Sequence, residues 1–198
     1  TGITYQWRKG TTNLVNGGNI SGANSQNLVL TGVSATDAGS YNVVVSGASP
    51  CAAITSSNAV LVVNQTVAIN SQPVVTQTIC TGNSVSFSVT ATGTGLTYQW
   101  RKGGINLTNG GTISGATTAI LTINPVVSAD TASDYNVVIT GTTPCNTVTS
   151  NSSALVVNEA IIISSQPVAS QTICSGTNAN FSVTATGTGI TYQWKKGT

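Results

Sequence analysis

The heptapeptide TYQW-[R/K]-K-G is found three times, at Thr4–Gly10, Thr97–Gly103 and Thr191–Gly197. It holds all three tryptophans of the chain, Trp7, Trp100 and Trp194, which are 93 and 94 residues apart. A repeat of this length is too long for one unit of a solenoid and suits one small domain. The sequence therefore predicts a tandem array of domains, of which the chain covers about two repeats.

Charge is scarce in this chain. Of 198 residues, 39% are hydrophobic and only 5% are charged, with six Lys or Arg and four Asp or Glu. An ordinary soluble domain has about 25% charged residues. Disorder is not expected, because disordered chains are rich in charge and poor in β-branched residues. A net charge of +2 without a basic stripe argues against nucleic-acid binding. No apolar run approaches the roughly 20 residues that span a bilayer.

Apolar and polar residues alternate along most of the chain. From Ser84 to Ala91 every second residue is apolar, which is typical of a half-buried antiparallel strand. Turn signals such as Asn16-Gly17 and Asn109-Gly110 separate such runs. Several short strands at this spacing predict an all-β sandwich. The expected core residues are Phe87, Trp100, Leu121, Ile123, Tyr135 and Val137, with Trp7, Tyr41, Phe181 and Trp194 as their equivalents.

The last strand of each repeat is expected to end near Asn64 and Asn158. This places a partial domain at 1–64, a complete domain at 65–158 and a second partial domain at 159–198. The first lacks its two opening strands, and the last holds only the first strands up to the third. Together they would make one domain, with about ten residues of overlap.

A core Trp followed by Asp-x-Gly-x-Tyr resembles the layout of immunoglobulin (Ig) domains. Asp37 to Tyr41 resemble the tyrosine corner of that fold. In the second repeat we expect Thr131 at the place of Asp37, with one extra residue near Val126 or Val127. Tyr135 remains, so we expect its corner hydrogen bond to survive. The resemblance puts Phe87 and Val137 where Ig domains carry their two core cysteines.

The segments TIC-[T/S]-G, FSVTATGTG, TYQW, NGG-x-ISGA and YNVV extend this resemblance over nearly the whole chain. They look like the tandem Ig-like repeats of large secreted or cell-surface bacterial proteins, of adhesin or filament type. The resemblance implies all-β Ig-like sandwich domains in a head-to-tail array. It also implies an extracellular or cell-surface location. It does not select one function, because such repeats serve several.

The Ig resemblance also bears on the four cysteines, Cys51, Cys80, Cys145 and Cys174. In an Ig sandwich Cys80 and Cys145 would lie at opposite poles, too far apart for a disulfide, which needs Cα atoms within about 7 Å. The pole of one domain adjoins the next in an array, so the resemblance implies disulfides across the junctions, with partners in adjacent domains or copies. An intradomain Cys80–Cys145 bond and free thiols are the alternatives.

The basic residues all follow the tryptophans: Arg8, Lys9, Arg101, Lys102, Lys195 and Lys196. They are either a solvated, solubilising turn or a contact for a polyanion such as an acidic glycan. The tryptophans are expected in the core rather than on a sugar-binding surface, because each shares its strand face with a Tyr.

Catalytic and metal-binding residues are few. The chain has no His, and its carboxylates are Asp37, Asp130, Asp134 and Glu159. This set offers no nucleophile–base pair, no paired acids and no C-x-x-C, so we expect no enzyme activity, no metal and no cofactor.

We therefore expect a structural segment of an extracellular filament or surface stalk, stiffened by disulfides. Its partners would be neighbouring repeats of the same polypeptide or identical copies, which could also complete one another by donated strands. The alternative is an adhesin that binds glycans or other surface ligands. The absence of Met and of a signal peptide at the start fits a fragment or a processed product.

Overall fold

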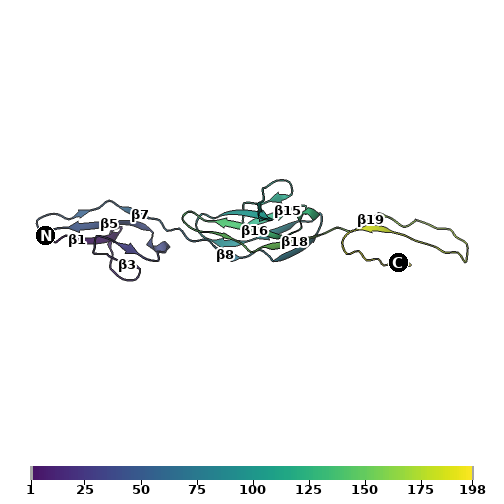
Figure 1. Cartoon of the computed structure of the whole chain (residues 1–198), viewed down its shortest axis with the longest axis horizontal. Coiled ribbons are helices and arrows are strands. Elements are labelled where there is room, and N and C mark those ends of the chain that lie inside the picture. The colour runs from purple at the N-terminus through teal and green to yellow at the C-terminus, as the bar shows by residue number, and fades with distance from the viewer. Residues whose placement is uncertain (1, 198) are drawn as a thin grey trace. The chain divides into compact units, whose positions relative to one another are not determined.

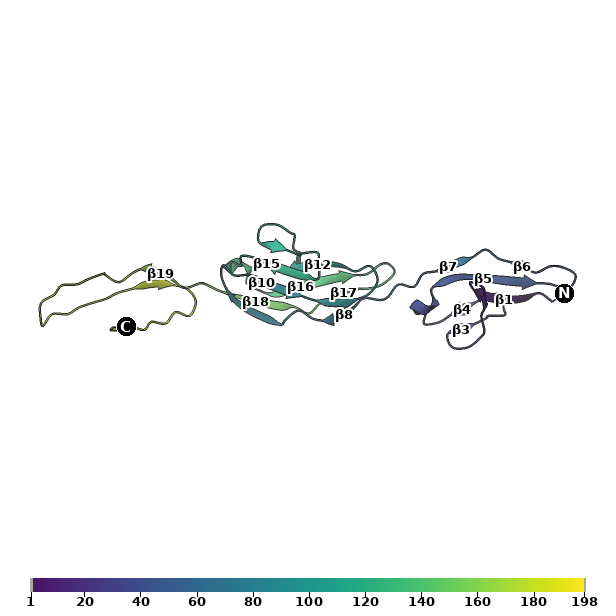
Figure 2. The ribbon, with the colours of Figure 1, turned by 180° about the vertical axis from the view of Figure 1, so that it is seen from behind.

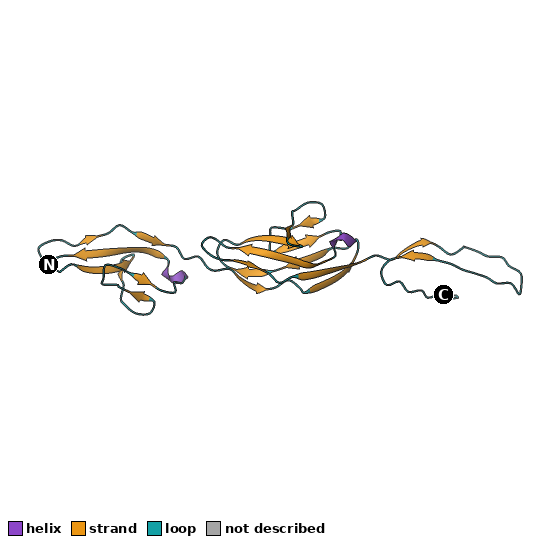
Figure 3. Cartoon of the chain, in the orientation of Figure 1, coloured by secondary structure: helices purple, strands orange, loops and turns teal. Residues whose placement is uncertain are grey.

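The computed structural model describes residues 2–197. The contacts divide the chain into two compact units. One comprises the residues up to Thr66 together with Thr142–Cys145, and the other comprises Val67–Gly141 and the residues from Asn146 onward. Strands and loops make up nearly all of both units (Figure 3), apart from two single-turn 3₁₀ helices. The division at 1–64, 65–158 and 159–198 stays a prediction.

The segment from Val67 to Asn158 forms a sandwich of β-sheets. Its elements are β8 (Ala68–Ser71), β9 (Thr76–Cys80), β10 (Val85–Ser88), β11 (Thr90–Thr92), β12 (Thr97–Lys102), β13 (Ile105–Asn106), β14 (Ile113–Ser114), β15 (Ile120–Ile123), η2 (Ser128–Asp130), β16 (Ala132–Thr140), β17 (Thr147–Thr149) and β18 (Ser153–Asn158). One layer has the order β13-β12-β16-β18-β9, with β17 also on β16. The other consists of β10-β15-β14 and the β11-β8 pair. Figures 1 and 2 show the two layers from opposite sides.

The core lies between these two layers. It consists of Val67, Val85, Phe87, Val89, Trp100, Leu121, Ile123, Val126, Tyr135, Val137, Ile139 and Leu155. The alternation over 84–91 buries Val85, Phe87 and Val89, as the period of two requires. The run is not one strand, however. It pairs with β15 up to Ser88 and with β8 from Thr90, so the ladder changes partner at Val89.

The first unit contains strands that are equivalent to the later strands of this sandwich, from β12 onward. They are β1 (Thr4–Lys9), β2 (Thr12–Asn13), β3 (Ile20–Ser21), β4 (Val29–Leu30), η1 (Ala35–Asp37), β5 (Gly39–Ser46), β6 (Ile54–Thr55) and β7 (Ala59–Leu61). β1 and β5 pair as β12 and β16 do, with Trp7 opposite Val43 and Trp100 opposite Val137. β4 has only two residues, whereas its equivalent β15 has four and a second neighbour in β10.

Residues 159–197 form less secondary structure than the matching stretch of the sandwich. Only β19 (Ile162–Ser165) and β20 (Thr184–Thr186) pair. The third copy of the heptapeptide forms no strand, although its first two copies are β1 and β12. Those two strands each pair with a long strand, β5 or β16, whereas the third copy pairs with no strand among residues 2–197. Strand formation by this motif therefore depends on its partner.

Candidate functional site

The heptapeptide anchors the centre of the sandwich. Trp100 is fully buried, and its indole Nε1 donates to the carbonyl of Thr118 at 2.9 Å. The Trp100 backbone N–H donates to the carbonyl of Ala116 at 2.8 Å. Gln99 Nε2 donates to the carbonyls of Trp100 and Leu107, both at 2.9 Å. The Gln of the motif thus fixes the following hairpin, a role that the sequence pattern did not reveal.

The ISGA segment, which marked the repeat in the sequence, positions the tryptophan. Gly115 has a φ of +74°, and a Cβ there would lie 1.9 Å from the carbonyl oxygen of Ile120. Ala116 follows, fully buried, and its N–H donates to Asn109 Oδ1 at 2.8 Å. The first repeat has the same contacts at Gly22 and Ala23. Only glycine fits this turn, which brings the Ala116 carbonyl to Trp100.

The tyrosine hydroxyls bond back to the turn before their strand in both repeats. Tyr41 Oη donates to the Asp37 carbonyl at 2.5 Å, and Tyr135 Oη donates to the Asp130 carbonyl at 2.7 Å. The tyrosine is four residues after its acceptor in the first repeat and five in the second. The expected hydrogen bond is therefore present in each.

The position of the extra residue in the second repeat was predicted wrongly. Ser34 N–H donates to Asp37 Oδ2 at 2.8 Å, and Val127 N–H donates to Asp130 Oδ2 at the same distance. Asp130, and not Thr131, therefore takes the place of Asp37. The register of β16 against β18 shifts between Ala132 and Tyr135, so a bulge there absorbs the added residue.

We expect alkaline pH to weaken the tyrosine corner. Burial, followed by the nearby Asp130, raises the pKa of Tyr135 above its usual value of about 10. Because the pKa of Tyr135 is raised in the folded state, the neutral hydroxyl contributes fully to the free energy of unfolding below about pH 10, and this contribution is lost as the pH rises further. Tyr135→Phe removes one hydrogen bond, which costs about 1 kcal/mol at neutral pH. The difference from the parent in urea denaturation should then shrink above pH 10. A difference that stays constant to pH 11.5 would contradict this.

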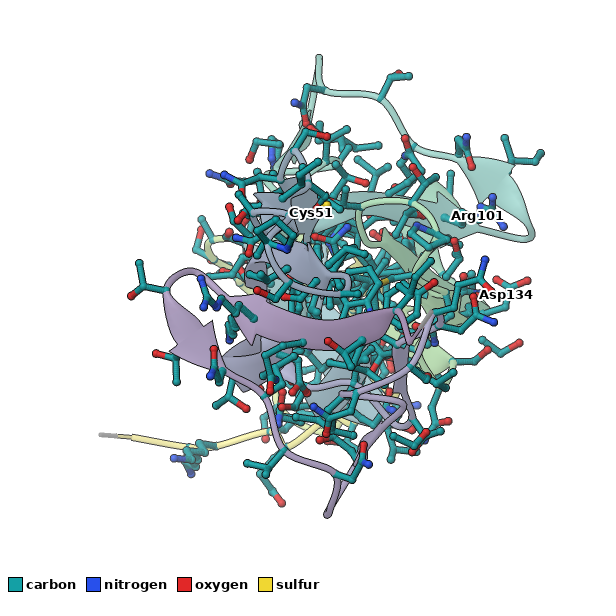
Figure 4. The ribbon with its side chains drawn as sticks, turned by 90° about the vertical axis from the view of Figure 1, so that its left-hand side faces the viewer. Cys51, Arg101 and Asp134 are labelled. Carbon is teal, nitrogen blue, oxygen red and sulfur yellow. The ribbon has the colours of Figure 1, made fainter. Side chains whose placement is uncertain are left out.

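The basic side chains of the first two repeats donate hydrogen bonds inside their own repeat, the arginines within their hairpin and the lysines to the 3₁₀ helix before the tyrosine. Arg101 Nε donates to Asn106 Oδ1 at 2.8 Å, and Arg8 makes the same bond to Asn13. Lys102 Nζ donates to the Ala129 carbonyl at 2.6 Å and lies 5.7 Å from the centre of the Tyr135 ring. In Figure 4, Arg101 and Asp134 lie toward the outside of the side chains. These contacts give the basic pairs a structural role; a polyanion contact stays a prediction.

All four cysteines are free thiols in the structure. Cys80 ends β9 and lies opposite Asn158 in the ladder with β18. The Cys145 thiol donates to the carbonyl of Asn64, with 3.5 Å between Sγ and O, and Asn64 Nδ2 donates to the Thr143 carbonyl at 3.2 Å. Asn64 and Asn158 hold the same place in successive repeats. This repeat position therefore meets both cysteines: Asn158 lies opposite Cys80 in the strand ladder, and Asn64 accepts the hydrogen bond of Cys145. Cys51, on the loop after β5, is exposed.

β9 and β18, the second and the last strand of the sandwich, lie side by side and run in the same direction. β9 and β18 pair in parallel over five residues, from Thr76 opposite Ala154 to Cys80 opposite Asn158. Ala154 N–H donates to the Val75 carbonyl at 2.8 Å, and the buried Ser153 hydroxyl donates to the Val74 carbonyl. The sequence pattern gave no sign of this ladder, because pairing between strands about 80 residues apart leaves no local signal.

The described residues 2–197 contain no group of three or more His, Cys, Asp or Glu side chains that could hold a metal ion. Within the same range, no helix has the length and apolar character needed to cross a bilayer.

No family model and no curated protein matches this sequence. Solved structures do match the fold. An I-band fragment from titin has a TM-score of 0.64 and 18% identity, with 83% of this chain and 58% of that fragment covered. The N-terminal four Ig domains of Dscam1 isoform 6.9 have a TM-score of 0.53 and 21% identity, with 78% of this chain and 37% of that chain covered. The chain has tandem Ig-like β-sandwich domains. It spans less than two thirds of either structure.

The Ig-like core of the sandwich has aromatic packing at the place of the inter-sheet disulfide of antibody domains. Phe87 on β10 stacks on Tyr135 of β16, with 4.9 Å between ring centres, and lies 6.2 Å from the Trp100 ring. Val137 on β16 is fully buried in the same cluster. None of the four cysteines belongs to this core cluster.

Proposed function

We propose that this chain is a structural segment of an extracellular filament or surface stalk of a bacterial cell, built from consecutive Ig-like domains. The parallel β9–β18 ladder supports this function best. Force applied along an array enters a domain through its first two strands, β8 and then β9, and leaves through its last strand, β18. With β9 and β18 parallel, such force shears the ladder, so that its hydrogen bonds bear the load together instead of one after another.

Two further observations fit this function. Trp100 is fully buried, so its ring is unavailable to stack on a sugar. The charge is low, so neighbouring arrays repel one another weakly. Disulfides across the domain junctions would restrict bending and stiffen the stalk. An extracellular location is part of this proposal, because disulfides across the junctions would persist only in an oxidising compartment.

Pulling the chain by its two ends in a single-molecule force experiment tests the role. We expect the sandwich to give the highest rupture force, with a length gain of roughly 3.6 Å for each of its residues. Val156 faces β9 with its N–H, because it lies two residues after Ala154. Val156→Pro should therefore lower the rupture force markedly, since it removes one bond of the ladder.

Val62→Pro is the matched control, since Val62 is the equivalent of Val156 in the first unit and is 72% exposed. It should leave the highest rupture force unchanged. Equal effects of the two variants would overturn the proposed role of the ladder. A glycan array on the same chain separates the adhesin alternative: saturable binding that single substitutions abolish would favour it.

A further inference from the structure

We propose that an Asn-Gly dipeptide in each of the first two repeats is a site of covalent modification that is closed in the folded domain and open when the domain unfolds. The two pairs are Asn16-Gly17 and Asn109-Gly110. Once the turn is open, the asparagine converts to aspartate and isoaspartate without an enzyme, and the isoaspartate form prevents refolding. This inference goes beyond the proposed stalk function, because it concerns the chemical fate of an unfolded domain and not the load that a folded one carries.

The reaction needs water as its only co-reactant. The backbone nitrogen of the glycine gives up its proton and attacks Cγ, the side-chain carbonyl carbon of the asparagine. The new N–Cγ bond closes a cyclic imide, a succinimide, while the bond from Cγ to the side-chain amide nitrogen breaks and that nitrogen leaves with the proton as ammonia. Water then opens the ring at either carbonyl and gives aspartate or isoaspartate. Glycine favours this attack, because it has no Cβ to hinder the approach.

In the folded sandwich, hydrogen bonds engage both reacting groups of Asn109-Gly110. The Gly110 N–H donates to the Ile113 carbonyl at 2.9 Å, and the Ile113 N–H donates to the Gly110 carbonyl at 3.0 Å. Asn109 Oδ1 accepts the N–H of Ala116 at 2.8 Å. The attacking nitrogen is thus engaged as a donor, and the side chain that it must reach is held toward Ala116. Ring closure therefore requires that these bonds open first.

The first repeat closes its Asn-Gly pair in the same way. The Gly17 N–H donates to the Ile20 carbonyl at 3.0 Å, and the Ala23 N–H donates to Asn16 Oδ1 at 2.8 Å. Asn16 and Asn109 are both exposed to solvent. Their protection in the folded domain therefore comes from hydrogen bonding and not from burial, and it ends when the turn opens.

The folded domain needs a side-chain acceptor at this reactive position. Ala116 is fully buried, and its N–H donates to Asn109 Oδ1 while its carbonyl accepts the Trp100 N–H at 2.8 Å. A buried N–H without an acceptor costs free energy. The asparagine therefore connects the surface turn to the backbone that positions Trp100, so that a change in the turn is transmitted to the core.

The two products differ in their effect on this turn. Aspartate keeps the backbone unchanged and offers a carboxylate oxygen to the Ala116 N–H. Isoaspartate carries the main chain through its former side chain, which inserts a methylene group into the backbone before Gly110. The paired bonds between Gly110 and Ile113 then lose their register with the contact to Ala116, because the length of a hairpin loop fixes its register. Isoaspartate at this position should therefore prevent the domain from folding again.

Peptide mapping of the chain by mass spectrometry, after incubation in mildly alkaline buffer with and without urea, tests the closure. We expect Asn109 in the folded chain to deamidate at about one hundredth of its rate in urea, since its hydrogen bonds must open first. Asn151-Ser152 is the internal control, because Asn151 is exposed and its side chain makes no hydrogen bond with the described residues 2–197. Its rate should change by less than about threefold, because an exposed loop opens at almost no cost. Equal rates at Asn109 under both conditions would overturn the proposal.

Refolding after increasing times in urea, with a reductant present throughout, tests the consequence. The fraction that regains the folded circular dichroism signal should fall in step with the isoaspartate content, which enzymatic methylation of the isoaspartate carboxylate measures. Asn16→Asp with Asn109→Asp keeps an acceptor oxygen for each alanine N–H and removes both reactive amides, so this double variant should lose its refoldable fraction much more slowly.

Asn151→Asp is the matched control and should lose its refoldable fraction as fast as the parent. A parent chain that refolds fully with isoaspartate at Asn109 would contradict the proposed effect of the modification, and so would equal losses in the parent and the double variant. The force experiment uses unmodified chain, so failure of this proposal and failure of the stalk function can be told apart.

Discussion

Trp100→Ala is expected to destabilise the sandwich by about 3–5 kcal/mol. Trp100 is completely buried, packs near Phe87 and donates its indole N–H to Thr118. Truncation leaves a large cavity and an unpaired carbonyl, both of which cost free energy. Urea denaturation followed by far-UV circular dichroism, which does not depend on the lost indole, measures the change.

The chain contains its own control for this substitution. Trp194 lies in the same heptapeptide and is 52% exposed. Trp194→Ala at a concentration where the chain is monomeric should change the stability by no more than about 0.5 kcal/mol. Similar losses for both variants would mean that the third heptapeptide is packed in a core, contrary to the structure.

Gly115→Ala is expected to cost about 3 kcal/mol or more. Two effects add at this position: a positive φ, and a Cβ only 1.9 Å from the Ile120 carbonyl oxygen. Gly111→Ala separates them, because Gly111 has a φ of +57° with nothing within 4 Å of the added atom. It should show the backbone cost alone, about 1–2 kcal/mol. Equal losses in urea denaturation would show that the loop moves aside freely.

The repeat, the all-β pattern and the central core were predictable from the sequence. Side chains such as Phe87 and Trp100 alternate with polar neighbours, and this local period decides which face is buried. The place of the extra residue was not predictable, because a bulge at Ala132–Tyr135 preserves the turn at Asp130 and shifts only the strand that follows.

Whether a segment becomes a strand depends on pairing with segments far along the chain. TQTIC forms β9 where β18 is present, and SQTIC at 170–174 forms no strand. The sequence alone places both segments alike, since their local preferences are the same. The same limit concealed the attachment of Cys145 to Asn64, which joins residues 81 apart in sequence.

The parallel ladder between β9 and β18 also has a consequence for folding kinetics. The bonds that tie the start of the sandwich to its end, such as Ser153 to Val74, span 79 residues. Contacts of this separation form late and slowly, because a long loop must be ordered first. During that delay the last strand of one repeat can pair with the equivalent of β9 in a neighbouring repeat of nearly the same sequence, and such swapping is a typical folding error of repeat proteins. In an array of these domains, the rate of synthesis relative to folding would then govern how many domains are correctly formed.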